Sequence, residues 1–167
     1  MVIGHIAGHG TDSGLTSMEA AGAASWLAIT NAVSRILIGG IADRFGVKLS
    51  FFLIFSLQVA AMLFLFPAGK ANWTLWAVSA IIGWNYGSMF TLFPAVCLNY
   101  FGAKEQGSNY GLLFTAWGFA GFSGPYVGGY LKDASGTYLV PFIVAAVMVG
   151  IAVLIFTVIK DPIKMKI

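Results

Sequence analysis

Charged residues are scarce in this sequence. Asp, Glu, Lys and Arg make up 9 % of the 167 residues, whereas 59 % are hydrophobic and the mean hydropathy is +0.86. A soluble globular domain usually contains about 25 % charged residues, so this chain could not cover a surface that faces water. The scarcity of charge excludes a soluble domain. The few basic residues are also scattered, mostly at the ends of apolar runs, which argues against a nucleic-acid partner.

Cysteine and histidine are equally rare. Cys97 is the single cysteine and lies in an apolar run, which excludes a disulfide framework and a cluster of metal-binding thiolates. His5 and His9 are spaced like two metal ligands on a helix, but no third ligand is apparent. We therefore predict no metal site and no cofactor.

One short motif raises the question of catalysis. Residues 121–124, with the sequence Gly-Phe-Ser-Gly, resemble the Gly-x-Ser-Gly stretch of intramembrane serine proteases. A nucleophilic serine needs a base, which in such a protease would come from a later helix. No histidine follows His9, so we predict that the protein is not an enzyme.

Long hydrophobic runs dominate the sequence. A helix needs about 20 apolar residues to cross a hydrocarbon core of about 30 Å, and five runs are long enough. We predict an all-α integral membrane fold with helices over 18–42, 49–66, 73–101, 110–131 and 138–159. Residues 1–9 are apolar but too few to cross, and we expect them to be the last turns of a preceding helix whose beginning is missing. A free external N-terminus is the alternative.

The positions of Lys and Arg predict the orientation. The loops at 43–48 and 102–109 and the C-terminal tail contain six of these residues: Arg44, Lys48, Lys104, Lys160, Lys164 and Lys166. The opposite side contains Lys70 and Lys132. Because loops rich in Lys and Arg stay in the cytoplasm, we predict a multi-pass protein of the cell (plasma or inner) membrane with a cytoplasmic C-terminus.

The five predicted helices differ in polarity. Helices 49–66 and 138–159 are apolar all round, so we expect them to be peripheral and to face lipid. The other three contain polar residues and two glycine pairs, Gly83 with Gly87 and Gly124 with Gly128, which permit close helix packing. We expect these three helices to line the interior.

Arg35 is the most informative single residue. It lies eight residues before Asp43, about 12 Å inside the end of its helix, where a guanidinium costs about 2.5 to 3.5 kcal/mol. No acidic residue of this chain lies at a comparable depth. Asn31, one turn away, can orient the guanidinium but cannot neutralise it. Either a carboxylate on a missing part of the protein pairs with Arg35, or a substrate anion does.

Residues 39–48, with the sequence GGIADRFGVK, form the most specific motif. This stretch resembles the loop signature of the major facilitator superfamily, although Val47 stands where a basic residue is usual. The residues expected to act as a conformational latch are Gly39, Asp43, Arg44, Gly46 and Lys48. Gly39 would admit a close neighbouring helix, and Gly46 would allow a tight turn.

The resemblance narrows to the oxalate/formate antiporter family. It rests on the stretches 31–35 (NAVSR), 93–95 (FPA) and 109–118 (NYGLLFTAWG). It implies that residues 1–167 are the C-terminal six-helix domain of such a transporter, with its first helix cut short and its five complete helices numbered eight to twelve. The N-terminal six-helix half would then be a missing partner.

The same resemblance implies the substrate site. Arg35 would bind a substrate carboxylate, and Trp117 stands where oxalate-transporting members have a second cation, a lysine. A site with one cation favours a monocarboxylate over oxalate, because a second carboxylate would be buried without a partner. With Asn31 beside Arg35, the aromatic residues Tyr86, Phe90 and Trp117 could surround a small organic acid.

The functional prediction is half of a secondary transporter for a small carboxylate. Transport would proceed by alternating access, as an antiporter or coupled to protons, and the chain alone would be inactive. The partners expected are the carboxylate, the missing half and membrane lipid. The alternative is a self-contained membrane bundle that serves as a structural or assembly subunit.

Overall fold

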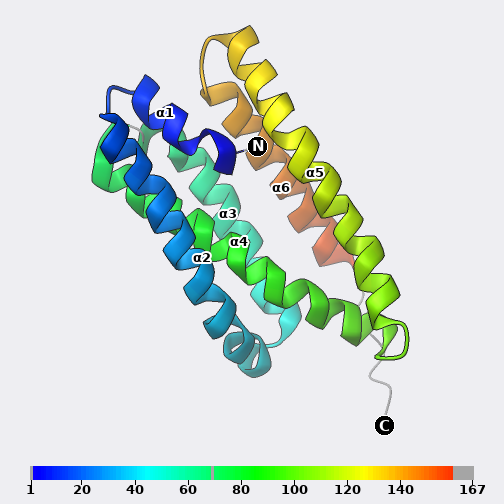
Figure 1. The fold of residues 1–167 in the computed structure, drawn as a ribbon. Coiled ribbons are helices and arrows are strands. Elements are labelled where there is room, and N and C mark those ends of the chain that lie inside the picture. Colours follow the sequence, from blue (N-terminus) through cyan, green and yellow to red (C-terminus); the bar gives the residue numbers. More distant parts are fainter. Residues whose placement is uncertain (1, 69, 160–167) are drawn as a thin grey trace.

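The computed structural model describes residues 2–68 and 70–159, which are almost entirely helical (Figure 1). The elements are a 3-10 helix η1 (Ile3–His5) and the helices α1 (Ile6–Asp12), α2 (Ser17–Phe45), α3 (Val47–Ala68), α4 (Asn72–Phe101), α5 (Gln106–Ser135) and α6 (Leu139–Val158). All five predicted long helices are present within a few residues of their expected bounds. The predicted all-helical fold is therefore confirmed, while the C-terminal tail, which was expected to be cytoplasmic, falls outside the described residues.

Local signals set the ends of the helices. Thr16 and Glu19 form a capping box at the start of α2, in which each side chain bonds the backbone N–H of the other residue. α5 starts and ends about one turn beyond the predicted range 110–131, because polar residues at its ends continue the helix. It stops at Gly136, which adopts the left-handed conformation with φ of 69°.

Residues 3–12 form one short helical segment, since η1 leads directly into α1. Its length of about 15 Å cannot cross a bilayer. The segment ends at a turn in which Gly14 has φ of 96°, and Val2 and Ile6 bury their side chains. The N-terminal residues are therefore packed against the bundle, which disagrees with the alternative of a free N-terminus.

Among residues 2–68 and 70–159, four helices are long and apolar enough to cross a membrane: α2, α3, α4 and α6. The sequence predicted five spans, and α5 is the predicted span that does not meet these criteria of length and hydropathy. Its 30 residues would extend about 45 Å, but glycine, serine, threonine and tyrosine dilute its apolar side chains. A helix that packs against protein rather than lipid needs less hydropathy, so length and composition alone do not identify α5 as a span.

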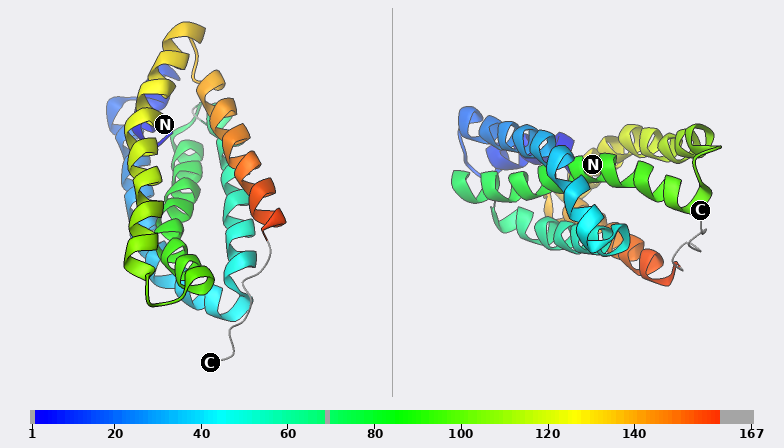
Figure 2. Two further views of the ribbon diagram at one scale, coloured as in Figure 1. Left: turned by 90° about the vertical axis from the view of Figure 1, so that its right-hand side faces the viewer. Right: turned by 90° about the horizontal axis from the view of Figure 1, so that it is seen from below.

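α4 occupies the centre of the bundle. Both views of Figure 2 show α2 and α5 on one side of α4, and α3 and α6 on the other side. The most extensive helix–helix contact is between α2 and α4. The three helices with polar faces are thus neighbours around one side of the bundle, and the two uniformly apolar helices pack together on the other.

Two glycines allow the close approach of α2 and α4. A Cβ added at Gly83 would overlap the carbonyl oxygen of Leu27, and one at Gly87 would overlap the carbonyl oxygen of Asn31. Larger residues would force the two backbones apart. The predicted packing role of this glycine pair is confirmed. Of the second pair, Gly128 is buried.

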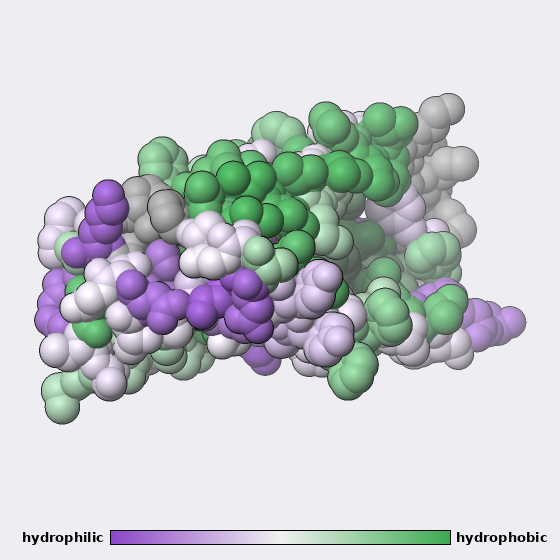
Figure 3. Space-filling model, turned by 90° about the horizontal axis from the view of Figure 1, so that it is seen from above, coloured by the Kyte–Doolittle hydropathy of each residue, from purple (hydrophilic) through white to green (hydrophobic). Residues whose placement is uncertain are grey.

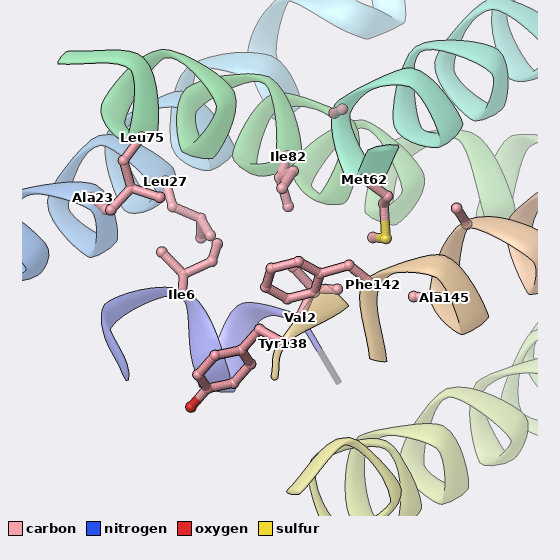
Figure 4. Close-up of a cluster of buried hydrophobic side chains, with 12 residues drawn as sticks. Val2, Ile6, Ala23, Leu27, Met62, Leu75, Ile82, Tyr138, Phe142 and Ala145 are labelled. Atoms are coloured by element: carbon pink, nitrogen blue, oxygen red, sulfur yellow. The ribbon is translucent and has the colours of Figure 1, made fainter. Parts of the chain in front are cut away.

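Apolar side chains form two buried clusters. One cluster joins α1, α2, α3, α4 and α6, with Ile6, Leu27, Met62, Ile82 and Phe142 converging (Figure 4). The second lies toward the other end of the bundle and consists of Ile38, Ala42, Phe51, Ile54, Phe55 and Leu92. α5 adds no residue to either cluster, so it is attached to the bundle by a smaller interface than the other long helices.

The two ends of the bundle differ in composition. The α2–α3 and α4–α5 connections lie at one end, and α1 and the α5–α6 connection lie at the other (Figure 1). At the latter end, Lys132 Nζ lies 3.3 Å from Asp12 Oδ2 and links α5 to α1. Figure 3 shows hydrophilic residues gathered over part of this end, beside a continuous hydrophobic surface. Charged residues thus cap the bundle, as expected at a membrane–water boundary.

Candidate functional site

An apolar groove of ≈ 240 Å³ lies between α4 and α5. Every residue that lines it belongs to one of these two helices. The lining consists of Tyr86, Met89, Phe90 and Phe93 from α4, and Tyr110, Leu113, Phe114, Ala116 and Trp117 from α5. Three of the residues that the sequence predicted for the substrate site, Tyr86, Phe90 and Trp117, are among them.

Helical periodicity places these side chains on facing stripes. On α4 the lining residues follow the spacing i, i+3, i+4, i+7 from Tyr86, and on α5 the same spacing runs from Tyr110 to Trp117. Residues at these intervals share one face of a helix. The sequence reasoning missed the stripe on α5, including Tyr110 and Phe114, although its spacing was a readable signal.

The rings inside the groove contact one another. Phe90 packs edge-on against Tyr86 at 5.2 Å and against Trp117 at 5.5 Å between ring centroids. Phe114 stacks on Trp117 at 4.8 Å with an interplanar angle of 22°. Such contacts are favourable at these separations, so the aromatic walls are positioned by their own packing.

Arg35 contacts the wall of the groove at Phe90. Its guanidinium carbon lies 4.5 Å from the centroid of the Phe90 ring, within the range of a cation–π interaction. Arg35 is exposed on α2, and no carboxylate forms an ion pair with it anywhere in residues 2–68 and 70–159. The guanidinium therefore keeps its hydrogen-bond donors available at one edge of the groove.

The backbone around Arg35 is fixed by α4. Thr91 Oγ1 donates a hydrogen bond to the Arg35 carbonyl oxygen at 3.2 Å, and Ser34 Oγ donates to the Asn31 carbonyl oxygen at 2.9 Å. Within the described part of the chain, the Asn31 side chain makes no hydrogen bond to Arg35. The spacing that suggested this bond brings the two residues to one face but does not join them, so a role for Asn31 stays a prediction.

The latch motif forms the turn between α2 and α3. Gly46 is the only residue between these helices, with φ of 87°, and its N–H donates to the Ala42 carbonyl oxygen at 2.8 Å. The tight turn expected at Gly46 is therefore confirmed. Asp43 and Arg44 are exposed in the last turn of α2, and Lys48 Nζ donates to the Ile159 carbonyl oxygen at 2.9 Å.

No helix of the described chain packs closely at Gly39, so the role predicted for this glycine stays a prediction. No described atom lies within 4 Å of the position that a Cβ would take there, so no described helix needs this glycine. The reason is that α2 presents the opposite stripe to α4, through Leu27, Asn31 and Ser34.

A buried polar pair links α3 to α4. Asn85 Nδ2 donates to Gln58 Oε1 at 2.9 Å, and both side chains are buried. Asn85 Oδ1 has no partner. The apolar helix α3 therefore turns Gln58 toward the bundle, which limits its lipid-facing surface to the remaining faces.

The two histidines pack against aromatic rings. His5 Nε2 lies 3.1 Å from the Pro125 carbonyl oxygen of α5. His9 is buried and meets Phe142 edge-on at 5.0 Å between centroids. These contacts attach the N-terminal helix to α5 and α6.

Comparison with known proteins identifies relatives. The sequence profile of the Major Facilitator Superfamily matches residues 2–166. Monocarboxylate transporter 13 of Rattus norvegicus is 27 % identical over 154 residues, which cover 90 % of this chain and 36 % of that protein. Monocarboxylate transporter 10 of Homo sapiens is 32 % identical over 139 residues, or 78 % of this chain and 26 % of the relative.

A yeast protein also matches part of this chain. The probable transporter MCH1 of Saccharomyces cerevisiae is 31 % identical over 99 residues, which cover 55 % of this chain and 20 % of that protein. The chain thus spans 36 % or less of the length of these three relatives. The similarity to each of them concerns one part of a larger protein.

Proposed function

Because this chain belongs to the major facilitator superfamily, a family of transporters and not of enzymes, we propose that it is the C-terminal half of a secondary transporter for a small monocarboxylate. Transport would proceed by alternating access, with the substrate held near the midplane between two halves. α5 then acts as the fifth membrane span, and the basic end of the bundle lies in the cytoplasm.

The observation that carries the proposal is the position of Arg35. Its guanidinium lies against Phe90 at the edge of the groove, and within the described ranges no carboxylate neutralises it. A cation at this depth of a membrane is costly when no protein counter-ion pairs with it. A substrate carboxylate at this edge would offset that cost and would explain why an arginine occupies this depth.

The choice of a monocarboxylate has two supports. The relatives named above include two monocarboxylate transporters. In addition, Trp117 occupies the groove wall opposite Phe90, where the predicted resemblance to the oxalate/formate family would place a second cation. A dicarboxylate would bury one charge without a partner. The oxalate/formate relationship itself and the choice between antiport and proton coupling stay predictions.

The exposed apolar faces support a second half. On α2, Met18 and Ile36 are 86 % and 80 % exposed, and on α5 Phe122 and Tyr126 are 85 % and 77 % exposed. These helices lie on the same side of α4 (Figure 2). Large apolar surfaces mark contacts with protein or lipid, so we propose that the N-terminal half packs on this side and closes the groove.

The substitution Arg35→Gln tests the proposal. It keeps hydrogen-bonding capacity but removes the charge, so binding of lactate should fall at least about tenfold, since a charge-assisted hydrogen bond contributes about 1.5 to 3 kcal/mol. The measurement is the ligand-induced rise in melting temperature in detergent. Lys104→Gln, at an exposed position between α4 and α5, is the control and should bind normally.

Two results would contradict the role of Arg35. A stable Arg35→Gln protein that gains the same thermal increment from lactate as the wild type would show that Arg35 is not a substrate ligand. A protein destabilised by about 3 to 5 kcal/mol before any ligand is added would instead indicate a static ion pair with a carboxylate of another segment.

A further inference from the structure

We infer that the groove between α4 and α5 binds the hydrocarbon tail of a monocarboxylate whose tail is bulky and aromatic and lacks an ammonium group. The inference rests on the proposed function and adds the chemical class of the substrate. It distinguishes an arylacetate or an aryl 2-oxo acid from a two- or three-carbon acid such as acetate or lactate.

The polarity of the lining excludes a small polar acid as the best-fitting occupant. Among the nine lining residues, the polar side-chain groups are the hydroxyls of Tyr86 and Tyr110 and the indole N–H of Trp117. The hydroxyl or keto group of a three-carbon acid would find few hydrogen-bond partners against these walls, and burying it there is unfavourable. An apolar tail loses nothing by entering and displaces water from apolar surface.

The size of the groove agrees with a tail of this kind. Its ≈ 240 Å³ approaches the lower limit of about 300 Å³ for pockets that hold drug-sized ligands. A two-carbon acid would leave most of this space filled with poorly bonded water. A phenyl group would fill the space and contact both helices at once.

The rings in the walls are arranged to receive another ring. Phe90 presents its edge to Trp117, while Phe114 and Trp117 stack nearly parallel. An aromatic tail that enters the groove beside this cluster meets ring edges and ring faces together, so it can form edge-to-face and stacked contacts. Each aromatic contact is favourable beyond the area it buries, so an aromatic tail should bind more tightly than an aliphatic tail of equal length.

Arg35 limits the length and charge of the ligand. Its guanidinium carbon is 4.5 Å from the Phe90 centroid, so a carboxylate bound there lies close to the ring wall, and one or two carbons suffice to link it to the tail. None of the groove-lining residues is acidic. An ammonium group beside the carboxylate would thus meet no counter-charge in the groove, which disfavours amino acids.

The test compares ligands on the purified protein in detergent. Binding of phenylacetate, acetate, phenylalanine and the neutral analogue phenylacetamide is measured by quenching of tryptophan fluorescence and by isothermal titration. Phenylacetate should bind at least about tenfold more tightly than acetate, because it buries a phenyl group, and more tightly than phenylalanine. Phenylacetamide reports partition into the micelle and should bind weakly and independently of Arg35.

A pair of phenylalanine variants locates the tail. Phe114→Ala should weaken phenylacetate binding by about fivefold or more, through loss of one aromatic wall, and should leave acetate binding unchanged. The matched control is Phe119→Ala, on the same helix but 75 % exposed and outside the groove. The wild-type ligand series needs no variant, so the inference stays testable if Phe114→Ala does not fold.

The outcomes separate the two proposals. Equal affinity for acetate and phenylacetate, both reduced by Arg35→Gln, would overturn this inference and leave the carboxylate transporter intact. Phenylacetate binding that matches phenylacetamide and ignores Arg35 would overturn both. Tight binding of phenylalanine would overturn the exclusion of an ammonium group.

Discussion

The guanidinium carbon of Arg35 lies 4.5 Å from the centre of the Phe90 ring, which joins a charged residue of α2 to the aromatic groove between α4 and α5. Two helices that meet along a glycine-lined contact bring these side chains together. The interaction orients the cation without neutralising it, because an aromatic face attracts a positive charge but carries no formal charge. Arg35 is held in position and still able to bind an anion.

Replacing Phe90 should weaken carboxylate binding indirectly. Phe90→Leu keeps the apolar bulk but removes the ring that orients Arg35, a loss of about 0.5 to 1 kcal/mol or roughly two- to fivefold in affinity. Lactate binding by titration calorimetry is the measurement. Phe101→Leu, at the exposed end of the same helix, is the control. Unchanged lactate affinity in Phe90→Leu would show that Arg35 is positioned by other groups.

A second cation in the groove should change specificity. Trp117→Lys places an ammonium group opposite Phe90, where it can pair with a second carboxylate. The ratio of oxalate to lactate affinity should rise by about tenfold in competition binding. Trp73→Lys, at the exposed start of α4, should leave the ratio unchanged. If Trp117→Lys inserts and folds with an unaltered ratio, position 117 does not contact the carboxylate.

The close packing of α2 and α4 predicts a large effect at Gly87. In Gly87→Leu the side chain would meet the Asn31 carbonyl oxygen and the Ser34 hydroxyl, and overpacking of this kind costs about 1 to 3 kcal/mol or more. The melting temperature in detergent should fall accordingly. In contrast, Gly118→Ala has open space around its Cβ and should be neutral or slightly stabilising. Equal melting temperatures for the two variants would contradict the predicted helix contact.

The buried pair of Gln58 and Asn85 predicts strong coupling. Gln58→Leu or Asn85→Leu alone leaves one buried amide without its partner, at a cost of about 1 to 3 kcal/mol. The double variant removes both groups and should be far less unstable than the sum of the two single changes. Thermal unfolding in detergent measures all four proteins. Additive losses would mean that the 2.9 Å hydrogen bond contributes little.

Labelling can establish whether α5 crosses the membrane. With Cys97 replaced by serine, single cysteines are introduced by Ala103→Cys and Asp133→Cys, at exposed positions near the two ends of α5. An impermeant maleimide should label the first only from the cytoplasmic side and the second only from the outside. Labelling of both from one side would remove α5 from the membrane-spanning helices.

The sequence was most informative about helices and least about how they pair. Apolar runs fixed the five long helices because a bilayer demands continuous hydrophobic length. The i, i+4 spacing of Tyr86 and Phe90 correctly placed them on one face, and the structure brings Trp117 against Phe90. The contact of Arg35 with Phe90 joins residues of different helices, so no local spacing could predict it.

The points at which the structure departs from the sequence predictions have a common physical origin. The sequence suggested that Gly39 packs against a neighbouring helix, yet α2 presents a different face to α4. Which face a helix presents depends on all of its neighbours, and local sequence does not contain that information. Asn31 and Arg35 share a face, but the rotamers that would join them compete with packing against α4 and Phe90. α5 carries many small and polar residues, so its hydropathy does not place it among the candidate spans, and its crossing of the membrane stays a prediction.

The single-residue connection at Gly46 holds the end of α2 directly beside the start of α3. Their crossing angle cannot change without moving a backbone already held at φ of 87°, and the bond from Lys48 to the end of α6 ties a third helix to the same hairpin. The connection between α4 and α5 is longer, over residues 102–105. The longer connection constrains α4 and α5 less than Gly46 constrains α2 and α3, so the width of the groove depends on how residues 102–105 set the angle between α4 and α5.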